Sequence, residues 1–220
     1  MKKLIKTYTV SILILLIPVL GAKAWALPLL NTDDAGIVSI HSCQIELFYR
    51  FHTQASPSTM VSPACNIFDQ AELSVSFNSD KDEQSYAIQL KRPFFIYNDF
   101  SIAASVQFEE QQGRNWHLNI PTSFDLSDKW KIDANIGYNQ FNHHPDRMIA
   151  IASTYSLNLL NEFSVEFSKI DSEDKTAAQF LYHYHIIPEK LSLYTAYGQS
   201  LTTDPPVSIG FGLSWIHPTF

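Results

Sequence analysis

The chain has 220 residues, a formal net charge of −7, a mean hydropathy of −0.07 and 13% aromatic residues. This acidic balance disfavours nucleic acids and other polyanions as partners. The middling hydropathy fits a soluble protein, and it also fits a membrane barrel whose strands alternate apolar and polar residues. The motifs GxSxG, HExxH and CxxC and the phosphate loop are absent. We therefore expect no enzyme, no cofactor and no dedicated metal ligands.

Residues 1–26 have the pattern of a secretory signal peptide. Lysines at positions 2, 3 and 6 precede an apolar run from Val10 to Leu20, and Ala24-Trp25-Ala26 places small residues at both cleavage-recognition positions. The run of about eleven residues is too short for a membrane helix. Cleavage after Ala26, with Ala24 as the alternative, removes four lysines and no acids and takes the net charge from −7 to −11. Such a chain is exported to the periplasm or the outer membrane of a Gram-negative cell.

From Cys43 onward, stretches of apolar/polar alternation are separated by short polar turns. In Trp130-Lys131-Ile132-Asp133-Ala134-Asn135-Ile136-Gly137-Tyr138 the period is two, which is the period of a β-strand. Ten such residues, tilted by about 45°, span about 24 Å, the height of the apolar band of a membrane barrel. The predicted strands are Cys43–His52, Gln70–Phe77, Ser85–Pro93, Phe100–Glu109, Asn115–Phe124, Trp130–Gln140, Met148–Tyr155, Glu162–Lys169, Ala177–Ile186, Leu191–Gly198 and Val207–Ile216.

These segments predict an all-β, antiparallel, up-and-down transmembrane barrel over residues 43–220, preceded by a periplasmic or plug-like segment at 27–42. Eleven strands conflict with the even count of bacterial single-chain barrels. Short and longer connections alternate along the chain, and this alternation requires a strand that descends between Cys43–His52 and Gln70–Phe77. Only 56–64 can supply it, although Pro57 and Pro63 make it a poor strand. We expect twelve strands, with ten as the alternative.

The two cysteines test this geometry. Cys43 opens the first strand and Cys65 follows the descending segment, so both should lie at the periplasmic end. An exported chain with two cysteines in an oxidising compartment usually joins them. A Cys43–Cys65 disulfide is therefore expected, with two buried free thiols as the alternative.

Several motifs resemble one family. They are Thr32-Asp33-Asp34-Ala35 after Leu30-Asn31, Cys43-Gln44-Ile45-Glu46, Pro63-Ala64-Cys65-Asn66, Ala71-Glu72-Leu73, Asn119-Ile120-Pro121-Thr122-Ser123 and Ala134-Asn135-Ile136-Gly137-Tyr138. The chain resembles the outer-membrane proteins named after the meta-cleavage pathway of phenol degradation, with Thr32, Asp33, Asp34, Ala35, Gln44 and Glu46 as the motif residues. The resemblance implies an outer-membrane barrel that passes small solutes, with aromatic compounds as candidates.

Function has to come from the lumen, because outward residues meet lipid. The polar parity of each strand predicts these lumen-facing residues besides Gln44 and Glu46: Arg50, Glu72, Lys91, Lys131, Asp133, Glu162, Glu166, His183 and His185. Charges of both signs can fill a narrow barrel as an ion-paired network instead of leaving a channel. Because the inward acids outnumber the bases, an open pore would prefer cations.

Two pairs of residues could form a binding site for a metal ion or another cation. His183 and His185 lie on one face at i and i+2, about 7 Å apart, and could share a metal given a third ligand such as Glu166. We favour a lumenal hydrogen-bond network there. Asp33-Asp34 could share a proton or a cation, but the residues precede the barrel and can cap backbone amides, so a turn or plug-like anchor is the favoured interpretation.

Three functions remain open: a channel or transporter for small solutes, a structural or interaction barrel with a closed lumen, and an outer-membrane enzyme that modifies lipid. The enzyme needs a Ser or Thr nucleophile beside a His on the lipid-facing side, and the inward placement of His183 and His185 argues against it. The resemblance favours the channel. Expected partners are outer-membrane lipid, small solutes and the barrel-assembly machinery, which would recognise the last strand and Phe220.

Overall fold

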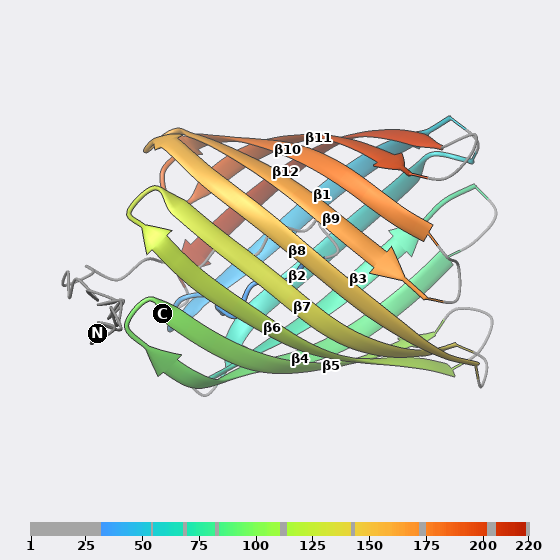
Figure 1. Cartoon of the computed structure of the whole chain (residues 1–220), viewed down its shortest axis with the longest axis horizontal. Helices are drawn as coiled ribbons and strands as arrows, with labels where there is room; N and C mark the ends of the chain where they lie inside the picture. The colour runs from blue at the N-terminus through green and yellow to red at the C-terminus, as the bar shows by residue number, and fades with distance from the viewer. Residues whose placement is uncertain are drawn as a thin grey trace, which may run out of the picture.

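The structure is a computed structural model that describes residues 32–53, 55–67, 70–81, 84–110, 114–141, 144–171, 175–201 and 206–218. The predicted signal peptide, residues 27–31 and Phe220 lie outside these ranges. Twelve antiparallel strands form one closed barrel, tilted with respect to its axis (Figure 1). They are β1 Ser42–His52, β2 Ser58–Ile67, β3 Ala71–Ser79, β4 Gln84–Tyr97, β5 Phe100–Glu110, β6 Arg114–Ser127, β7 Trp130–Phe141, β8 His144–Asn158, β9 Asn161–Ile170, β10 Lys175–Ile187, β11 Leu191–Ser200 and β12 Val207–Pro218.

Each strand pairs with its neighbours in sequence, and β12 closes the barrel on β1, with Ser42 opposite Pro218. The prediction of twelve strands is confirmed. The twelfth is β2, which begins two residues and ends three residues later than predicted. Pro63 faces Ile45 of β1, while the β2–β3 ladder is interrupted between Val61 and Ala64. This interruption accommodates a residue that has no N–H to donate.

The connections at one end of the barrel are tight. Two- or three-residue turns lie at 98–99, 128–129, 159–160 and 188–190, at the end of the barrel where β12 terminates (Figure 1). We call this the short-turn end. Asn98 and Glu189 have φ angles of 47° and 62°, in the left-handed region that lets a chain reverse within a short turn.

The outer surface of the barrel is apolar. Ile45, Leu47, Tyr49 and Phe51 of β1 alternate outward with exposures of 38–47%. All of the remaining strands except β2 also expose large apolar residues, as with Ile136 of β7 at 68%. Near the turns of the short-turn end, Phe95 packs on Phe100 and Trp130 on Tyr155. An apolar belt with an aromatic girdle is the surface of a membrane-spanning barrel. The described residues contain no helix that is long and apolar enough to cross a membrane.

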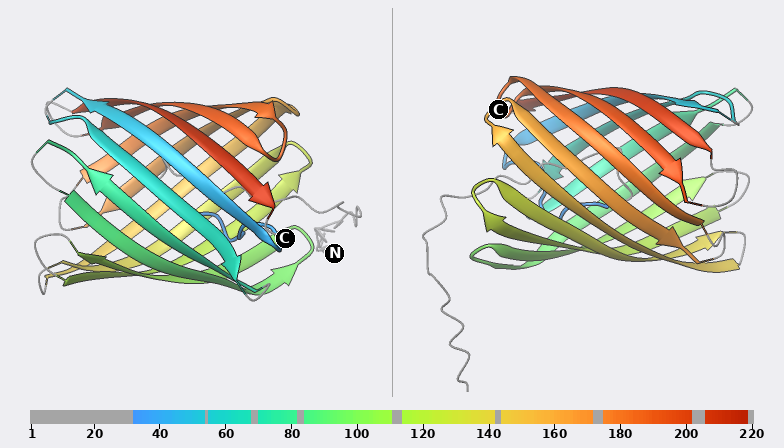
Figure 2. Two further views of the ribbon diagram at one scale, coloured as in Figure 1. Left: turned by 180° about the vertical axis from the view of Figure 1, so that it is seen from behind. Right: turned by 45° about the horizontal axis from the view of Figure 1, so that its top comes forward.

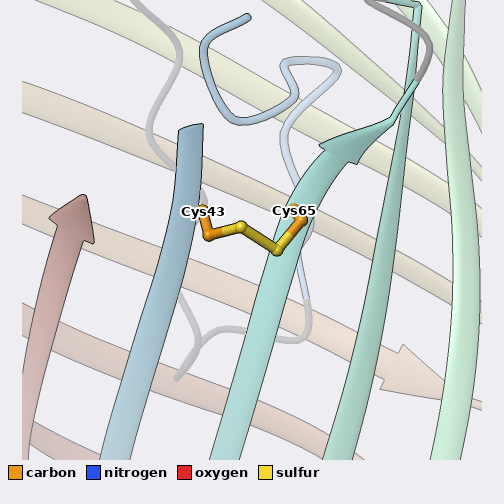
Figure 3. Close-up of a disulfide and its surroundings, with 2 residues drawn as sticks. All are labelled: Cys43 and Cys65. Atoms are coloured by element: carbon orange, nitrogen blue, oxygen red, sulfur yellow. A yellow bond between two sulfur atoms is a disulfide. The ribbon is translucent and has the colours of Figure 1, made fainter. Parts of the chain in front are cut away.

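The chain enters the barrel before β1. Residues 32–38, which we call the lumenal segment, form a coil inside the wall at the short-turn end (Figure 2). At the same end the predicted disulfide is present: Cys43 lies directly opposite Cys65 in the β1–β2 ladder and is bonded to it, with 4.1 Å between the Cα atoms (Figure 3). The disulfide therefore fixes the start of β1, where the lumenal segment joins the wall.

Candidate functional site: the lumen and its N-terminal segment

The lumenal segment is buried in the barrel interior. Thr32, Asp34, Ala35 and Val38 are each at most 6% exposed. Three of its backbone N–H groups donate to wall side chains: Thr32 to Glu166 Oε2 at 2.6 Å, Ala35 to Ser123 Oγ at 2.8 Å and Val38 to Glu72 Oε2 at 2.8 Å. The acceptors belong to β9, β6 and β3, so the segment is held from several sides. Hydrogen bonds from N–H groups to ionised carboxylates are among the stronger ones in proteins.

Two lysines of the wall bind the aspartates of the segment. Lys91 Nζ of β4 lies 3.0 Å from Asp33 Oδ1 and 3.7 Å from Asp34 Oδ1. Lys131 Nζ of β7 lies 3.2 Å from Asp34 Oδ2. Lys91 is only 1% exposed, and a buried ammonium is tolerated only when it is paired. The segment therefore supplies charges that the lysines need.

Each lysine also has an acid on the wall itself. Glu72 Oε1 lies 3.8 Å from Lys91 Nζ, and Asp133 Oδ1 lies 3.2 Å from Lys131 Nζ. The wall thus contains its own partial charge compensation. We call the part of the wall from β3 to β7, with Glu72, Lys91, Lys131 and Asp133 on its inner side, the charged wall.

The two aspartates of the segment differ electrostatically. Burial, reinforced by the neighbouring Asp34 and Glu72 carboxylates and opposed by Lys91, raises the pKa of Asp33 to about 6. Burial also acts to raise the pKa of Asp34, but the ion pairs with Lys131 and Lys91 outweigh it and lower that pKa below its ordinary value. Asp34 is therefore the permanently ionised member of the pair.

Asn135 of β7 holds the backbone of Asp33. In the amide orientation that satisfies both groups, its side chain donates to the Asp33 carbonyl oxygen at 2.7 Å and accepts from the Asp33 N–H at 2.8 Å. Asn135 is 1% exposed. The wall thus binds the backbone of Asp33 as well as the side chains of Asp33 and Asp34. Recognition by hydrogen bonds and ion pairs together is more specific than charge attraction alone.

A second arc of the lumen, formed by β1, β10, β11 and β12, has a different character. Phe48, Leu181 and Tyr194 point inward and pack together. Gly210 and Gly212 of β12 make room for Phe48: a Cβ at position 210 would lie 2.2 Å from Phe48 Cζ, and one at 212 would lie 2.8 Å from Phe48 Cδ2. We call this arc the aromatic wall. Sequence reasoning missed it, because apolar residues in strands were assigned to the lipid face.

The predicted histidine pair lies at the edge of the aromatic wall. His183 and His185 of β10 point inward and are 2% and 5% exposed. The β9–β10 register places Glu162 opposite His183. Glu166, the third ligand considered from the sequence, instead accepts from Thr32 and from Gln179 Nε2 at 3.2 Å. The residue that completes the cluster is therefore Glu162.

The remaining predicted lumen-facing residues are also on the inner side of the wall. Gln44 Nε2 donates to Glu46 Oε1, and Arg50 Cζ lies 5.4 Å from the centre of the Phe48 ring. Sequence reasoning missed a further pair: His117 Nε2 of β6 lies 3.1 Å from Glu109 Oε2 of β5, with Asn139 Oδ1 at 2.9 Å from its Nδ1. Polar parity could have identified both residues as inward, but only the strand register pairs them.

The barrel is similar to solved outer-membrane porins. A KdgM porin determined in complex with disordered oligogalacturonate superposes with a TM-score of 0.69 at 8% identity, covering 78% of this chain and 98% of that chain. A NanC porin gives 0.65 at 11% identity, covering 78% and 98%. An outer-membrane channel from Pseudomonas putida F1 gives 0.59 at 10% identity, covering 82% and 97%. At these identities the likeness establishes the fold.

Comparison with curated proteins finds no match to the sequence. The family described as uncharacterised conserved protein UCP029691 matches residues 14–214, nearly the whole chain, and the protein belongs to this family.

Proposed function

We propose that the protein is an integral outer-membrane barrel that acts as a passive channel for small solutes, narrowed at its short-turn end by the lumenal segment. The observation that carries this proposal is a closed twelve-stranded wall that is apolar outside and, apart from the aromatic wall, mainly polar inside. Eight strands are filled by their own side chains, whereas a wider barrel leaves room for something else. Here that room accommodates residues 32–38.

The class of solute is inferred from the structural neighbours and from the sequence motifs. The structural neighbours are described as porins and channels, and one was determined with an oligogalacturonate. The resemblance of the Thr32-Asp33-Asp34-Ala35 and Cys43-Gln44-Ile45-Glu46 motifs to the family named after phenol degradation favours small aromatic solutes. Phenols and small aromatic acids are therefore the first probes. Insertion through the assembly machinery, by recognition of the last strand, belongs to the same proposal.

The second candidate is a barrel with a closed lumen and a structural or interaction role. It is favoured by the ion pairs that Lys91 and Lys131 make with both the segment and the wall. Such a network can be permanent. The two candidates differ in whether the segment can leave its site while the barrel stays intact.

The test is single-channel conductance in a planar bilayer for the mature protein and for Asp33→Asn/Asp34→Asn. This double substitution removes the ion pairs of the segment, while Glu72 and Asp133 continue to compensate the two lysines. Asp128→Asn, at an exposed turn of the same end, is the matched control. Heat-modifiable gel mobility verifies that each protein is folded.

For the channel we expect discrete conductance steps that become larger or more frequent in Asp33→Asn/Asp34→Asn and unchanged steps in Asp128→Asn. Block of these steps by phenols or aromatic acids would support the proposed solute class. Silent bilayers with both the mature protein and the double variant, each shown to be folded and inserted, would instead establish the closed barrel.

A further inference from the structure

His183 is a buried imidazole whose ring nitrogens lack hydrogen-bond partners among the described residues. The residue is 2% exposed, and neither Nδ1 nor Nε2 is hydrogen-bonded to this part of the chain. The ring packs against Tyr194, with 4.0 Å between the ring centres. Buried polar groups are almost always satisfied, and an exception calls for a missing partner. A ligand that binds imidazole nitrogen would supply it.

Two further ligand atoms converge on the same point. Glu162 Oε2 lies 3.6 Å from His183 Nδ1 and 3.4 Å from His185 Nε2. One ligand atom from each of Glu162, His183 and His185 lies within 4.8 Å of the others, the one such group of three among the described residues. Both distances exceed those of a good N–H···O hydrogen bond. They match the separation of about 3.3 Å between two ligands of a tetrahedral Zn²⁺ with bonds of about 2.0 Å.

Glu162 and His185 are each oriented by a hydrogen bond through their other polar atom. His185 Nδ1 lies 2.8 Å from Ser192 Oγ, so its Nε2 faces Glu162. Ser156 Oγ donates to Glu162 Oε1 at 2.7 Å, which leaves Oε2 toward the histidines. Hydrogen bonds of this kind orient metal ligands and fix the imidazole tautomer.

We propose that Glu162, His183 and His185 form a binding site for a divalent transition metal of the Zn²⁺ class, at the lumen wall near the short-turn end. Two imidazoles and one carboxylate suit Zn²⁺, Cu²⁺ or Ni²⁺, whereas Ca²⁺ and Mg²⁺ require mainly oxygen ligands. The Glu162 side chain is 21% exposed, so an ion reaches the cluster from the lumen. Three protein ligands leave a fourth position for water or for a solute group.

A nucleophilic role for the same residues is disfavoured. Ser192 beside His185 has the composition of a Ser-His-Glu triad, but Ser192 is 1% exposed and its oxygen is a partner of His185 Nδ1 within the wall. A nucleophile must reach its substrate. The hydrogen-bond network expected from the sequence is also incomplete, because His183 takes no part in it.

The test is equilibrium dialysis of the folded, untagged mature protein in detergent against Zn²⁺, with the bound metal quantified. The protein carries His143→Asn/His144→Asn throughout, so that these two histidines, adjacent in the sequence, do not bind metal adventitiously. Glu162→Gln is the first variant because it nearly preserves shape. His183→Asn and His185→Asn follow, and His117→Asn, from the His-Glu pair on β5 and β6, is the matched control.

We expect one Zn²⁺ per chain, displaced by Cu²⁺ or Ni²⁺ but not by excess Ca²⁺ or Mg²⁺. Ser192→Ala should weaken binding about 10- to 100-fold, as loss of an orienting hydrogen bond does. Each ligand variant should weaken it further, and His117→Asn should leave it unchanged. Absence of bound Zn²⁺ in the parent protein, or equal binding by the parent and folded Glu162→Gln, would overturn the proposal.

Discussion

The charged wall and the aromatic wall line the same lumen but are stabilised by different interactions: ion pairs in the first and side-chain packing in the second. On the charged wall, Lys91 and Lys131 are satisfied by carboxylates, part of which come from a segment outside the barrel strands. On the aromatic wall, Phe48 and Tyr194 fill space that Gly210 and Gly212 leave open. Ion pairs depend on which groups are present and ionised, whereas packing depends on shape. The charged wall is therefore suited to reversible binding, and the aromatic wall to a fixed contour.

The largest expected effect comes from breaking the charged wall at its most buried cation. Lys91→Met leaves Asp33, Asp34 and Glu72 without their shared partner, so the free energy of unfolding should fall by about 3–5 kcal/mol. Denaturant unfolding followed by tryptophan fluorescence measures the change. Lys190→Met, at an exposed turn of the same end, should change stability little; a similar loss in both variants would contradict the assignment.

Cys43→Ser tests how much the disulfide stabilises the barrel at the start of β1, which follows the lumenal segment. The disulfide closes a loop with a sequence separation of 22, which in the chain-entropy model contributes about 3 kcal/mol. Strand content should be retained because Cys43 and Cys65 face each other within a complete ladder. Equal resistance of oxidised and reduced parent protein to unfolding, measured by heat-modifiable gel mobility, would exclude this contribution.

Glycine-to-alanine substitutions compare the two walls directly. Gly210→Ala should cost about 1–3 kcal/mol, because its Cβ would lie 2.2 Å from Phe48 Cζ and force a buried ring to move. Gly137→Ala, on the charged wall, meets the flexible Met148 Cε at 3.2 Å and should be nearly neutral. The destabilisation by Gly210→Ala should vanish in the Phe48→Leu background. A double-mutant cycle of unfolding free energies, from the parent, both single variants and the double variant, measures this.

The smallest expected effect is a pH dependence of the lumenal segment. Docking raises the pKa of Asp33 from 3.8 to about 6, so the docked state binds more protons and is favoured as pH falls through 6. Asp34, whose pKa is lowered, stays ionised in this range. Between pH 7.5 and 5.5 the ratio of conducting to blocked channels should decrease about fourfold. Asp33→Asn should weaken this dependence, and a ratio that rises on acidification in the parent protein would contradict it.

The strands could be predicted from the sequence because lipid outside and polar groups inside impose a period of two on each of them. The exception was β2, where Pro63 and several small residues obscure the pattern, and only the alternation of the connections required it. The metal cluster could not be completed, because the third ligand depends on the β9–β10 register that places Glu162 opposite His183. The period of two puts Phe48 on the same face of β1 as Gln44, Glu46 and Arg50. The space for its ring could not be predicted, since it depends on two glycines of a strand more than 150 residues away.

The connection between the lumenal segment and β1 is short, so the segment stays close to its binding site even when its ion pairs are broken. Four residues lie between Val38 and Cys43, which is bonded to Cys65 of β2, and the five Cα–Cα steps that join them reach about 17 Å when extended. A segment that leaves its lysines therefore remains tethered beside them, at an effective concentration of roughly millimolar or more. A dissolved carboxylate that competes for Lys91 and Lys131 has to exceed this local supply, so the barrel would respond to abundant solutes and ignore trace ones.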